Sequence, residues 1–491
     1  MPDRPNLLFI LSDQHAARIA GCYGDGLAET PALDGLARRG VLFENAYCAS
    51  PVCVPSRMAL LTASQPFRQE CWTNDDILAS DRPTWAHALG AAGYRPELIG
   101  RLHALGPDQL HGFVHREIGD HSPNWAGLPG HDLGVLAGAN DPMPESLIRS
   151  GPGRCSYELK DEDTTAAASA FLRHWARRAK DGTKFALHVG LMLPHPPYVC
   201  TPADFDTFAG RVALPRLDPP RDEHPWLAWW RSNRGIAAVA PEAALRARTA
   251  YYGLVLSLDR MIGRILETLE ATGLIGDTLV IYASDHGDHL GERGLWWKHT
   301  LHEESVKVPL ILSWPGHLPE GERRRNVVGL PDLAQTILEA AGAPALPGAT
   351  GRSFLSLARD ARQPWSDEAL AEYCTDAVPA WTGGMAVQQR MLRAGHWKLC
   401  YYHGYRPQLF DLANDPDEMD DLGEDPKLTP VREKLAARLM AEWDPERIRA
   451  RMAVRRREKD LLAAWAKRVG PESRFLWPLS PEQNRLETAM S

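Results

Sequence analysis

The sequence predicts an α/β fold in which helices flank a large, mostly parallel β-sheet, followed by a smaller C-terminal α+β subdomain. Short apolar runs alternate with longer helical patterns as far as Ala341, as expected for strands joined by helical crossovers. After Glu372, short strand-like runs follow one another and two helical patterns end the chain. Because 491 residues exceed one ordinary core, we expect a large domain over residues 1–375 and a subdomain over residues 376–491.

The expected strands of the large domain are short apolar runs bounded by polar residues or glycine. They cover Asn6–Ser12, Val41–Tyr47, Tyr94–Gly100, Phe185–Leu193, Asp277–Ser284 and Lys307–Ser313. The expected helices cover Pro31–Arg39, Pro55–Ala63, Pro83–Ala92, Asp163–Lys180, Glu242–Thr272 and Leu330–Ala341. The first helix has clear end signals, with Thr30 as N-cap, Pro31 at the first position and Gly40 after the end.

Two stretches of the large domain lack strand or helix periodicity. Residues 105–160 are rich in Gly, Pro, His and Asp, and residues 201–240 are rich in Pro and Trp. We expect loops in both stretches. Long loops inside a compact domain are often functional, so the first stretch is a candidate part of a binding site.

The C-terminal subdomain is expected to combine short antiparallel strands with two helices. The strands cover Gly384–Val387, Trp397–Tyr402 and Gln408–Leu412, and the helices cover Pro430–Trp443 and Glu446–Val469. The last helix carries a basic run formed by Arg451, Arg455, Arg456, Arg457 and Lys459. The simpler interpretation of this run is a solvated face, and a subunit contact is the alternative.

Composition and charge exclude several classes of function. The net charge of -8 argues against a general nucleic-acid binder. No apolar run approaches the roughly 20 residues of a membrane span, and the first residues lack the pattern of a secretory signal. We therefore expect a cytoplasmic protein with no nucleic-acid or membrane partner. The eight scattered cysteines form no CxxC pair, which predicts buried thiols rather than a zinc site or a disulfide framework.

Two expected strands end in an acid that is followed by a second potential metal ligand. Asp13-Gln14 follows the first strand, and Asp285-His286 follows the strand that ends at Ser284. In an open α/β sheet, ligands bind at the carboxyl ends of the strands, so neighbouring strands would aim both pairs into one crevice. Such ligands suit calcium, magnesium or manganese. Taken singly, each acid is more simply a turn or helix-cap residue.

Cys53 lies just before an expected helix, between these two ligand pairs in the sequence. The N-terminus of a helix favours an anion and acidifies a thiol. A lone cysteine is most simply a buried thiol, and only the residues around Cys53 favour a catalytic role.

Cys53-Val54-Pro55-Ser56-Arg57 resembles the C-x-P-S-R signature of the sulfatase family. Other segments that resemble the family are Arg4 to Asp13, Thr30 to Asp34, Asp285 to Asp288, Val308 to Leu310 and Gln408 to Glu418. The resemblance covers most of the chain and implies an alkaline-phosphatase-like fold. Gly106 to Phe113 and Gly291 to Trp296 resemble the choline-sulfatase-like branch of the family.

The resemblance implies that a formylglycine-generating enzyme oxidises Cys53 to Cα-formylglycine during maturation. It also implies one divalent metal ion, calcium in the first place and manganese or magnesium as alternatives, held by Asp13, Gln14, Asp285 and His286. The aldehyde would hydrate, and one hydroxyl would attack the sulfur of a small-molecule sulfate ester. The alcohol would leave first, and inorganic sulfate would follow as the carbonyl re-forms.

The resemblance assigns roles to five further residues. Arg57 would brace the group at position 53, and His103, in a segment resembling the G-K-x-H motif, would take the proton that releases sulfate. Arg101 stands where the family usually has Lys, which keeps the charge but changes its geometry. His195 and Lys298 would hold sulfate oxygens and help to protonate the leaving alcohol. We expect His299 and His302 at the surface or behind the site.

The alcohol end of the substrate is less defined by the sequence. Asn74, Trp125 and Glu372 are the expected substrate contacts, and an acid with aromatic residues could hold a quaternary ammonium. Choline sulfate, a sugar sulfate and an alkyl or aryl sulfate all stay open. The tail after Trp443 resembles the oligomer-forming tail of the choline-sulfatase-like branch, so a homo-oligomer is expected through this segment.

Two alternative functions stay open at this point. The first is a phosphonate monoester or phosphodiester hydrolase of the same superfamily, which the pair of Gln14 and His286 also resembles. Arg101 and His103 argue against it, because that rival usually lacks both. The second is a non-catalytic homologue in which Cys53 stays a thiol.

Overall fold

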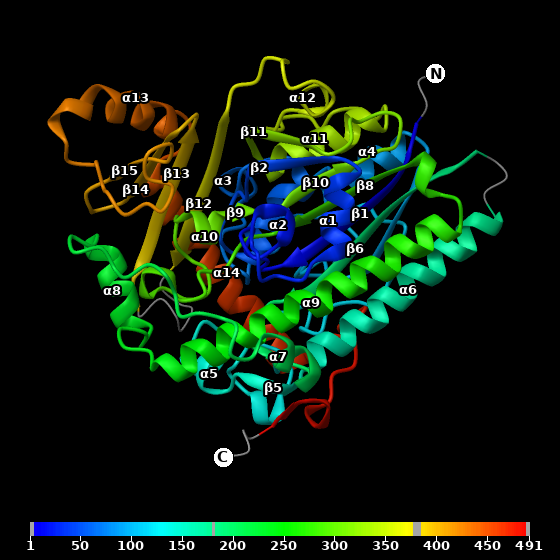
Figure 1. Cartoon of the computed structure of the whole chain (residues 1–491), viewed down its shortest axis with the longest axis horizontal. Helices are drawn as coiled ribbons and strands as arrows, with labels where there is room; N and C mark the ends of the chain where they lie inside the picture. Colours follow the sequence, from blue (N-terminus) through cyan, green and yellow to red (C-terminus); the bar gives the residue numbers. More distant parts are fainter. Residues whose placement is uncertain (1–3, 179–181, 377–383, 488–491) are drawn as a thin grey trace.

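The computed structural model describes residues 4–178, 182–376 and 384–487 (Figure 1). Its main feature is a nine-stranded sheet with the order β11-β2-β10-β8-β1-β6-β3-β4, in which β9 also pairs with β2. These strands are β1 (Asn6–Asp13), β2 (Val41–Tyr47), β3 (Tyr94–Gly100), β4 (His115–Glu117), β6 (Lys184–Pro194), β8 (Thr278–Ser284), β9 (Lys307–Val308), β10 (Leu310–Ser313) and β11 (Glu322–Gly329). The mostly parallel sheet that the sequence predicts is therefore confirmed.

The centre of the sheet is parallel, and every residue of β1 and β8 is buried. β1 pairs in parallel with β8 on one side and with β6 on the other, and β3 pairs in parallel with β6. Leu7, Phe9 and Leu11 of β1 face one hydrophobic core, whereas Leu8 and Ile10 face the other. A strand that is buried on both faces has a nearly continuous run of apolar residues. This is why β1 could be predicted from the sequence.

Helices cover both faces of this sheet. α6 (Ser156–Arg178) and α9 (Pro241–Ala271) pack side by side on one face (Figure 1). The core of the other face includes residues of α2 (Cys53–Thr62), α4 (Trp85–Ala91) and α11 (Leu330–Ala340). α1 (Pro31–Arg38) packs against α9, and none of the described helices is long and apolar enough to cross a bilayer.

The sequence-based prediction is wrong for several strands of the large domain outside the parallel centre. The strand expected over Lys307–Ser313 is interrupted at Pro309, because proline has no N–H to donate to a ladder. Its second half, β10, runs antiparallel to β2 and β8. β4 and β11 were not expected, because β4 is very short and the first half of β11 is charged and mostly exposed.

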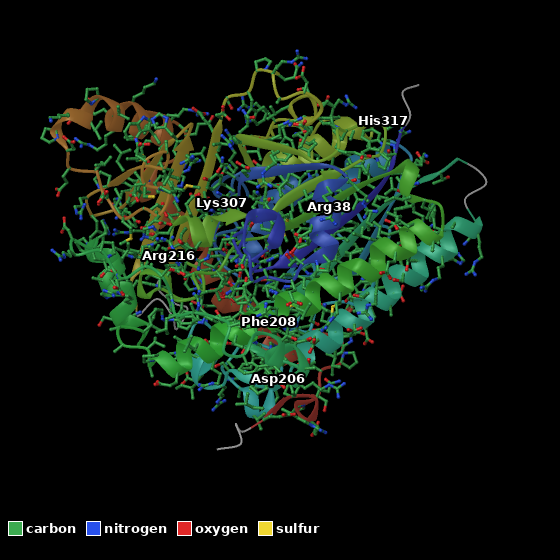
Figure 2. The ribbon with its side chains drawn as sticks, in the orientation of Figure 1. Arg38, Asp206, Phe208, Arg216, Lys307 and His317 are labelled. Carbon is green, nitrogen blue, oxygen red and sulfur yellow. The ribbon has the colours of Figure 1, made fainter. Side chains whose placement is uncertain are left out.

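The stretch over residues 201–240 is also not simply a loop. It contains α7 (Pro202–Phe208) and α8 (Pro225–Asn233). Thr201 and His224 cap these helices, and each helix begins with proline, a start signal that the surrounding Pro-rich composition conceals. Arg216, between the two helices and labelled in Figure 2, binds Asp417 of the C-terminal region at 2.6 Å.

The stretch over residues 105–160 is largely irregular, as expected, but three short elements interrupt it besides β4. They are η2 (Gly134–Leu136), α5 (Glu145–Ile148) and β5 (Gly151–Arg154). β5 forms a small sheet with β7 (Val199–Cys200) and with β16 (Arg485–Leu486) near the end of the chain. The C-terminal segment therefore closes back onto the large domain.

The C-terminal part has the expected α+β composition. An antiparallel sheet is formed by β12 (Glu368–Asp376), β13 (Ala386–Ala394), β14 (Trp397–Tyr402) and β15 (Gln408–Asp411). α13 (Thr429–Met440) and α14 (Pro445–Val469) follow it. The sheet begins at Glu368, so its first strand lies within the segment expected to end the large domain.

The basic run on α14 is not simply a solvated face. Arg451 binds Glu70 at 2.7 Å. The buried ammonium of Lys459 lies 3.1 Å from Asp76 and 3.3 Å from Asp376. The expectation of a solvated face is therefore wrong for Lys459, which α14 packs against acids of the large domain and of β12, whereas Arg451 forms a partly exposed ion pair.

Candidate active site

The carboxyl ends of the four central parallel strands β8, β1, β6 and β3 meet at one edge of the sheet. Asp285, Asp13, His195 and Arg101 stand at or just after these four ends. Cys53 is the first residue of α2. One ligand atom from each of Asp13, Cys53, Asp285 and His286 lies within 4.8 Å of the others, and all four residues are buried. The parallel sheet therefore brings together side chains that are far apart in the sequence.

Gln14 joins this cluster through a left-handed backbone conformation with φ of 66°. Its backbone N–H donates to Asp285 at 3.0 Å, and its side-chain NH2 donates to Asp288 at 2.7 Å. The amide oxygen of Gln14 is thereby turned towards the cluster, where it accepts from the Lys298 ammonium at 2.8 Å. Tyr198 also donates to Asp288, at 2.7 Å, so Asp288 is held in place from a second side.

His286 is prepared to act as a neutral ligand. Burial lowers the pKa of His286 to about 4. Its Nδ1 lies 3.2 Å from the Gly287 carbonyl, which fixes the proton on Nδ1 and leaves the Nε2 lone pair facing the cluster. Two carboxylates, an amide oxygen and an imidazole suit a hard or intermediate divalent cation. The residues expected to bind metal, Asp13, Gln14, Asp285 and His286, fit such an ion.

Two buried arginines balance the two acids. Arg57 donates to Asp285 at 2.8 Å and to Asp13 at 3.1 Å, and Arg101 donates to Asp13 at 2.6 Å. Burial acts to raise the pKa of Asp13, but the nearby cations, Arg101 foremost, hold it well below the usual value. Asp13 is therefore ionised and fixed in orientation.

Cys53 is the side chain on which these groups converge. Its Sγ lies 3.0 Å from the Lys298 ammonium and 3.2 Å from Nε2 of His286. The next backbone N–H, that of Val54, donates to Asn74 at 3.0 Å. The helix N-terminus and the ammonium together favour a negatively charged or strongly polar group at position 53.

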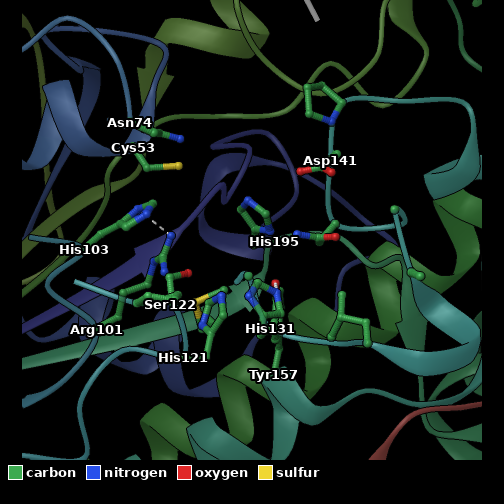
Figure 3. Close-up of a pocket in the computed structure, with 18 of the residues that line it drawn as sticks. Cys53, Asn74, Arg101, His103, His121, Ser122, His131, Asp141, Tyr157 and His195 are labelled. Carbon is green, nitrogen blue, oxygen red and sulfur yellow. Dashed lines mark hydrogen bonds between the residues drawn. The ribbon is translucent and has the colours of Figure 1, made fainter. Parts of the chain in front are cut away.

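Cys53 opens into a cavity of about 450 Å³. Figure 3 shows Cys53, Asn74, Arg101, His103 and His195 around this cavity, and Lys298 also lines it. Arg101 donates to Nδ1 of His103 at 2.7 Å. Burial, followed by the charge of Arg101, lowers the pKa of His103 well below its usual value, so its ring is neutral. The sulfate-binding residues expected from the sequence therefore share one cavity with Cys53.

Two glycines make the Arg101 position possible. A Cβ at Gly190 of β6 would lie 1.8 Å from the Arg101 carbonyl oxygen. Gly100 has φ of 88° and lies against the Gly190 carbonyl, which accepts the Arg101 N–H at 2.8 Å. The chain turns sharply after β3 only because both residues lack a side chain.

The family model for sulfatases matches residues 5–343 of this chain. The chain belongs to the sulfatase family. A second family model, for the C-terminal part of N-sulphoglucosamine sulphohydrolase, matches residues 291–444 of this sulfatase.

Individual relatives and solved structures agree with this assignment. The sulfatase is 31% identical over 483 residues to the choline-sulfatase of Rhizobium meliloti (strain 1021), covering 90% of this chain and 88% of the relative. It is 28% identical over 450 residues to human (Homo sapiens) arylsulfatase K, covering 85% of this chain and 78% of the relative.

Two solved structures share its alkaline-phosphatase-like fold. The phosphonate monoester hydrolase of Agrobacterium radiobacter has a TM-score of 0.73 at 23% identity, covering 91% of this chain and 96% of that chain. BT4656, solved in complex with D-glucosamine-2-N,6-O-disulfate, has a TM-score of 0.70 at 19% identity, covering 90% of this chain and 99% of that chain.

Two of the three expected substrate contacts lie outside the cavity lining of the sulfatase. Trp125 packs edge to face on Trp465 of α14, with ring centroids 5.0 Å apart. Glu372 is buried in β12, where its N–H donates to the Ala49 carbonyl. Only Asn74 of the three lines the cavity.

The position of Trp125 follows from the tail of the chain. The neighbouring Asn124 donates its N–H to Ser473 at 3.2 Å and accepts from the Arg474 N–H at 2.6 Å. The C-terminal tail therefore pulls this loop towards α14.

Several cavity residues were missed by the sequence analysis. His121, His131, Asp141 and Tyr157 line the cavity and come from the stretch that was expected to be a functional loop, but no motif marks them. His299 also lines the cavity, whereas His302 lies behind it and contacts Glu418 at 3.0 Å. Both histidines are buried. The expected surface position is therefore wrong, and the expected position behind the site is confirmed for His302.

Proposed function

We propose that this sulfatase cleaves a sulfate monoester to an alcohol and inorganic sulfate, using formylglycine made from Cys53 and one divalent metal ion. The observation that supports this most is the position of Cys53. Its side chain lies at the metal-ligand cluster and also at the end of a cavity lined by Arg101, His195 and Lys298. These basic side chains suit the three free oxygens of a sulfate ester.

The ligands expected to hold the metal are Asp13, Gln14, Asp285 and His286. When bound, a divalent cation supplies Lewis acidity and favours the deprotonated form of a nearby hydroxyl. Arg57 orients both carboxylates through its two ion pairs. We propose that the metal is calcium because three of the four donor atoms are oxygens. Manganese and magnesium are the alternatives. Elemental analysis of the purified protein would distinguish the three metals.

The aldehyde at position 53 adds water to give a carbon that carries two hydroxyls. The oxygen of one hydroxyl, after losing its proton, forms a bond to sulfur as the bond from sulfur to the alcohol oxygen breaks. His195 and Lys298 line the cavity where that alcohol oxygen takes up its proton. The second hydroxyl then loses its proton, the carbonyl re-forms, and sulfate leaves with the bridging oxygen.

His103 is the proposed acceptor of that last proton. Arg101 can only donate, so it occupies the Nδ1 lone pair of His103 and leaves the proton of the neutral ring on Nε2. His103 therefore accepts a proton at Nδ1 only when the contact with Arg101 opens. If Arg101 turns to bind the sulfate oxygens, it releases Nδ1 of His103. Binding of the sulfate group would thereby make His103 able to accept the proton.

The alternative function is hydrolysis of a phosphonate monoester or phosphodiester. The TM-score of 0.73 to the phosphonate monoester hydrolase favours keeping it. The deciding experiment compares kcat/KM for p-nitrophenyl sulfate with that for a p-nitrophenyl phosphonate ester on one preparation of the metal-loaded protein. We expect the sulfate to react faster because Arg101 and His103 are both present. A larger kcat/KM for the phosphonate would contradict the proposal.

A further inference from the structure

The wall of the active-site cavity next to His195 is formed by three ring side chains. The His121 and His131 ring centroids lie 4.4 Å apart, and those of His121 and Tyr157 lie 4.5 Å apart. Nε2 of His131 lies 2.9 Å from the Tyr157 hydroxyl. Figure 3 shows these three side chains grouped on one side of the cavity. We call them the imidazole wall.

The imidazole wall lies where the alcohol part of a substrate must go. The Tyr157 ring centroid is 6.1 Å from that of His195, the residue assigned to the leaving alcohol. Cys53 lies at the other end of the group of residues in Figure 3. A sulfate bound beside Cys53 therefore directs its ester oxygen and carbon chain towards His195 and the wall.

His121 offers an unused polar atom at this wall. The residue is 5% exposed, it lines the cavity, and its Nδ1 has no hydrogen-bond partner in the described part of the chain. Leaving a buried polar atom unpaired costs free energy, so a ligand that pairs with it gains affinity.

Both histidines of the wall are neutral. Burial lowers the pKa of His131 to about 4 and that of His121 well below its usual value. A neutral imidazole has one nitrogen that donates a hydrogen bond and one that accepts. A hydroxyl group can likewise both donate and accept a hydrogen bond. Neutral rings therefore match hydroxyls better than they match anions.

Two acids that line the cavity beyond the wall select against a second anion near them. Asp132 and Asp141, from the loop after Gly130, line the cavity and are exposed to it. In Figure 3, Asp141 lies across the cavity from Cys53. The basic lining residues belong to the sulfate end, so a substrate with a second sulfate or a carboxylate would place that group near these acids.

The wall is a poor site for a quaternary ammonium or a large aryl group. Tyr157 is the single Phe, Tyr or Trp among the described lining residues, and its hydroxyl is already bound to His131. A cation–π site needs the face of one or more aromatic rings, and Trp125 is held away against Trp465.

We propose that the imidazole wall, together with Asp141, is the alcohol subsite, and that it takes a polyhydroxylated alcohol, such as a sugar, that carries a single sulfate and no other negative charge. The proposal deepens the function proposed above and rests on it. The volume of about 450 Å³ lies within the range of small-molecule sites.

The test measures binding without turnover, in the full-length Cys53→Ala variant. Glucose 6-sulfate, choline O-sulfate, p-nitrophenyl sulfate and a glucose disulfate are titrated by calorimetry. We expect glucose 6-sulfate to bind most tightly. In this background His121→Leu should weaken the binding of glucose 6-sulfate by about fivefold or more, because a hydrogen bond to Nδ1 is lost, and the binding of p-nitrophenyl sulfate by less than about twofold.

Two matched variants separate recognition from folding. His121→Gln keeps a donor and an acceptor and should retain most of the affinity for glucose 6-sulfate. Asp141→Asn should raise the affinity for the disulfate relative to the affinity for glucose 6-sulfate. Tighter binding of choline O-sulfate or of the disulfate than of glucose 6-sulfate by the Cys53→Ala protein would overturn the subsite. Equal losses for the sugar and aryl sulfates in His121→Leu would overturn it as well.

Turnover by the unmutated protein tests separately whether the protein is a sulfate ester hydrolase, as proposed above. If aryl sulfate is hydrolysed but the sugar sulfate shows no preference in binding, the subsite fails and the function stands. If the expected binding pattern appears but no sulfate ester is hydrolysed, the function fails and the subsite stands.

Discussion

Glu372 provides a test of whether a buried acid serves the fold or the substrate. Burial raises the pKa of Glu372 from 4.5 to about 7, and the charge of Arg390 offsets only part of this. The folded state therefore holds a proton on Glu372 between about pH 4.5 and 7, whereas the unfolded chain has released it. The contribution of Glu372 to the free energy of unfolding is therefore at its maximum below pH 4.5 and is lost as the pH rises through 7. At 1.36 kcal/mol per pKa unit, the loss is on the order of 3 kcal/mol.

The assay compares the melting temperature of the unmutated protein with that of Glu372→Gln at pH 5 and at pH 8. Glutamine mimics the protonated acid, so the two proteins should melt together at pH 5. At pH 8 the variant should melt a few degrees higher, because it escapes the cost of the buried charge. Glu433→Gln, at an exposed site on α13, is the control and should show no such pH dependence.

The same variant also tests the expected substrate contact. Because Glu372 does not line the cavity, Glu372→Gln should leave KM unchanged for every sulfate ester. A melting difference that is equal at pH 5 and pH 8 would refute the pKa argument. A raised KM would instead restore Glu372 as a substrate contact.

Three further variants test the site and its supports. Cys53→Ala should abolish turnover while the circular dichroism spectrum stays unchanged, and residual turnover would contradict the nucleophile assignment. Asp288→Ala should weaken metal binding about 10- to 100-fold in chelator competition, because it frees the Gln14 amide; equal affinity would show that Asp288 does not orient the ligand. Lys459→Met should cost about 3–5 kcal/mol of unfolding free energy, measured by denaturant titration, because it removes the cation that pairs with the buried Asp76. Arg457→Met, at an exposed position on the same helix, should cost little, and equal losses in both would contradict the role of Lys459.

The central strands and the metal-ligand cluster could be predicted because their signals are local. β1 and β8 each contain a continuous apolar run, and an acid ends β1 and directly follows β8. Strand ends of the same kind in a parallel sheet meet at one edge, so the meeting of Asp13 and Asp285 followed from the pattern.

The alcohol end of the cavity could not be predicted because its shape depends on distant segments. Trp125 was expected at the substrate, but the C-terminal tail holds its loop against α14 through Ser473 and Arg474. His121, His131 and Tyr157 come from an aperiodic stretch and the start of a helix, with no spacing that marks them. Charged edge strands such as β11 were missed for a related reason, since partial burial weakens the alternation of apolar residues.

The most direct test of the central claim relates turnover to the chemical state of residue 53. Preparations made with and without a co-expressed formylglycine-generating enzyme would be analysed by peptide mass spectrometry for the fraction of aldehyde at position 53. The kcat for p-nitrophenyl sulfate would be measured on the same metal-loaded samples. The account predicts a kcat proportional to the aldehyde fraction, with a line through zero. Equal turnover by preparations that keep the Cys53 thiol, or no turnover by fully converted protein, would contradict it.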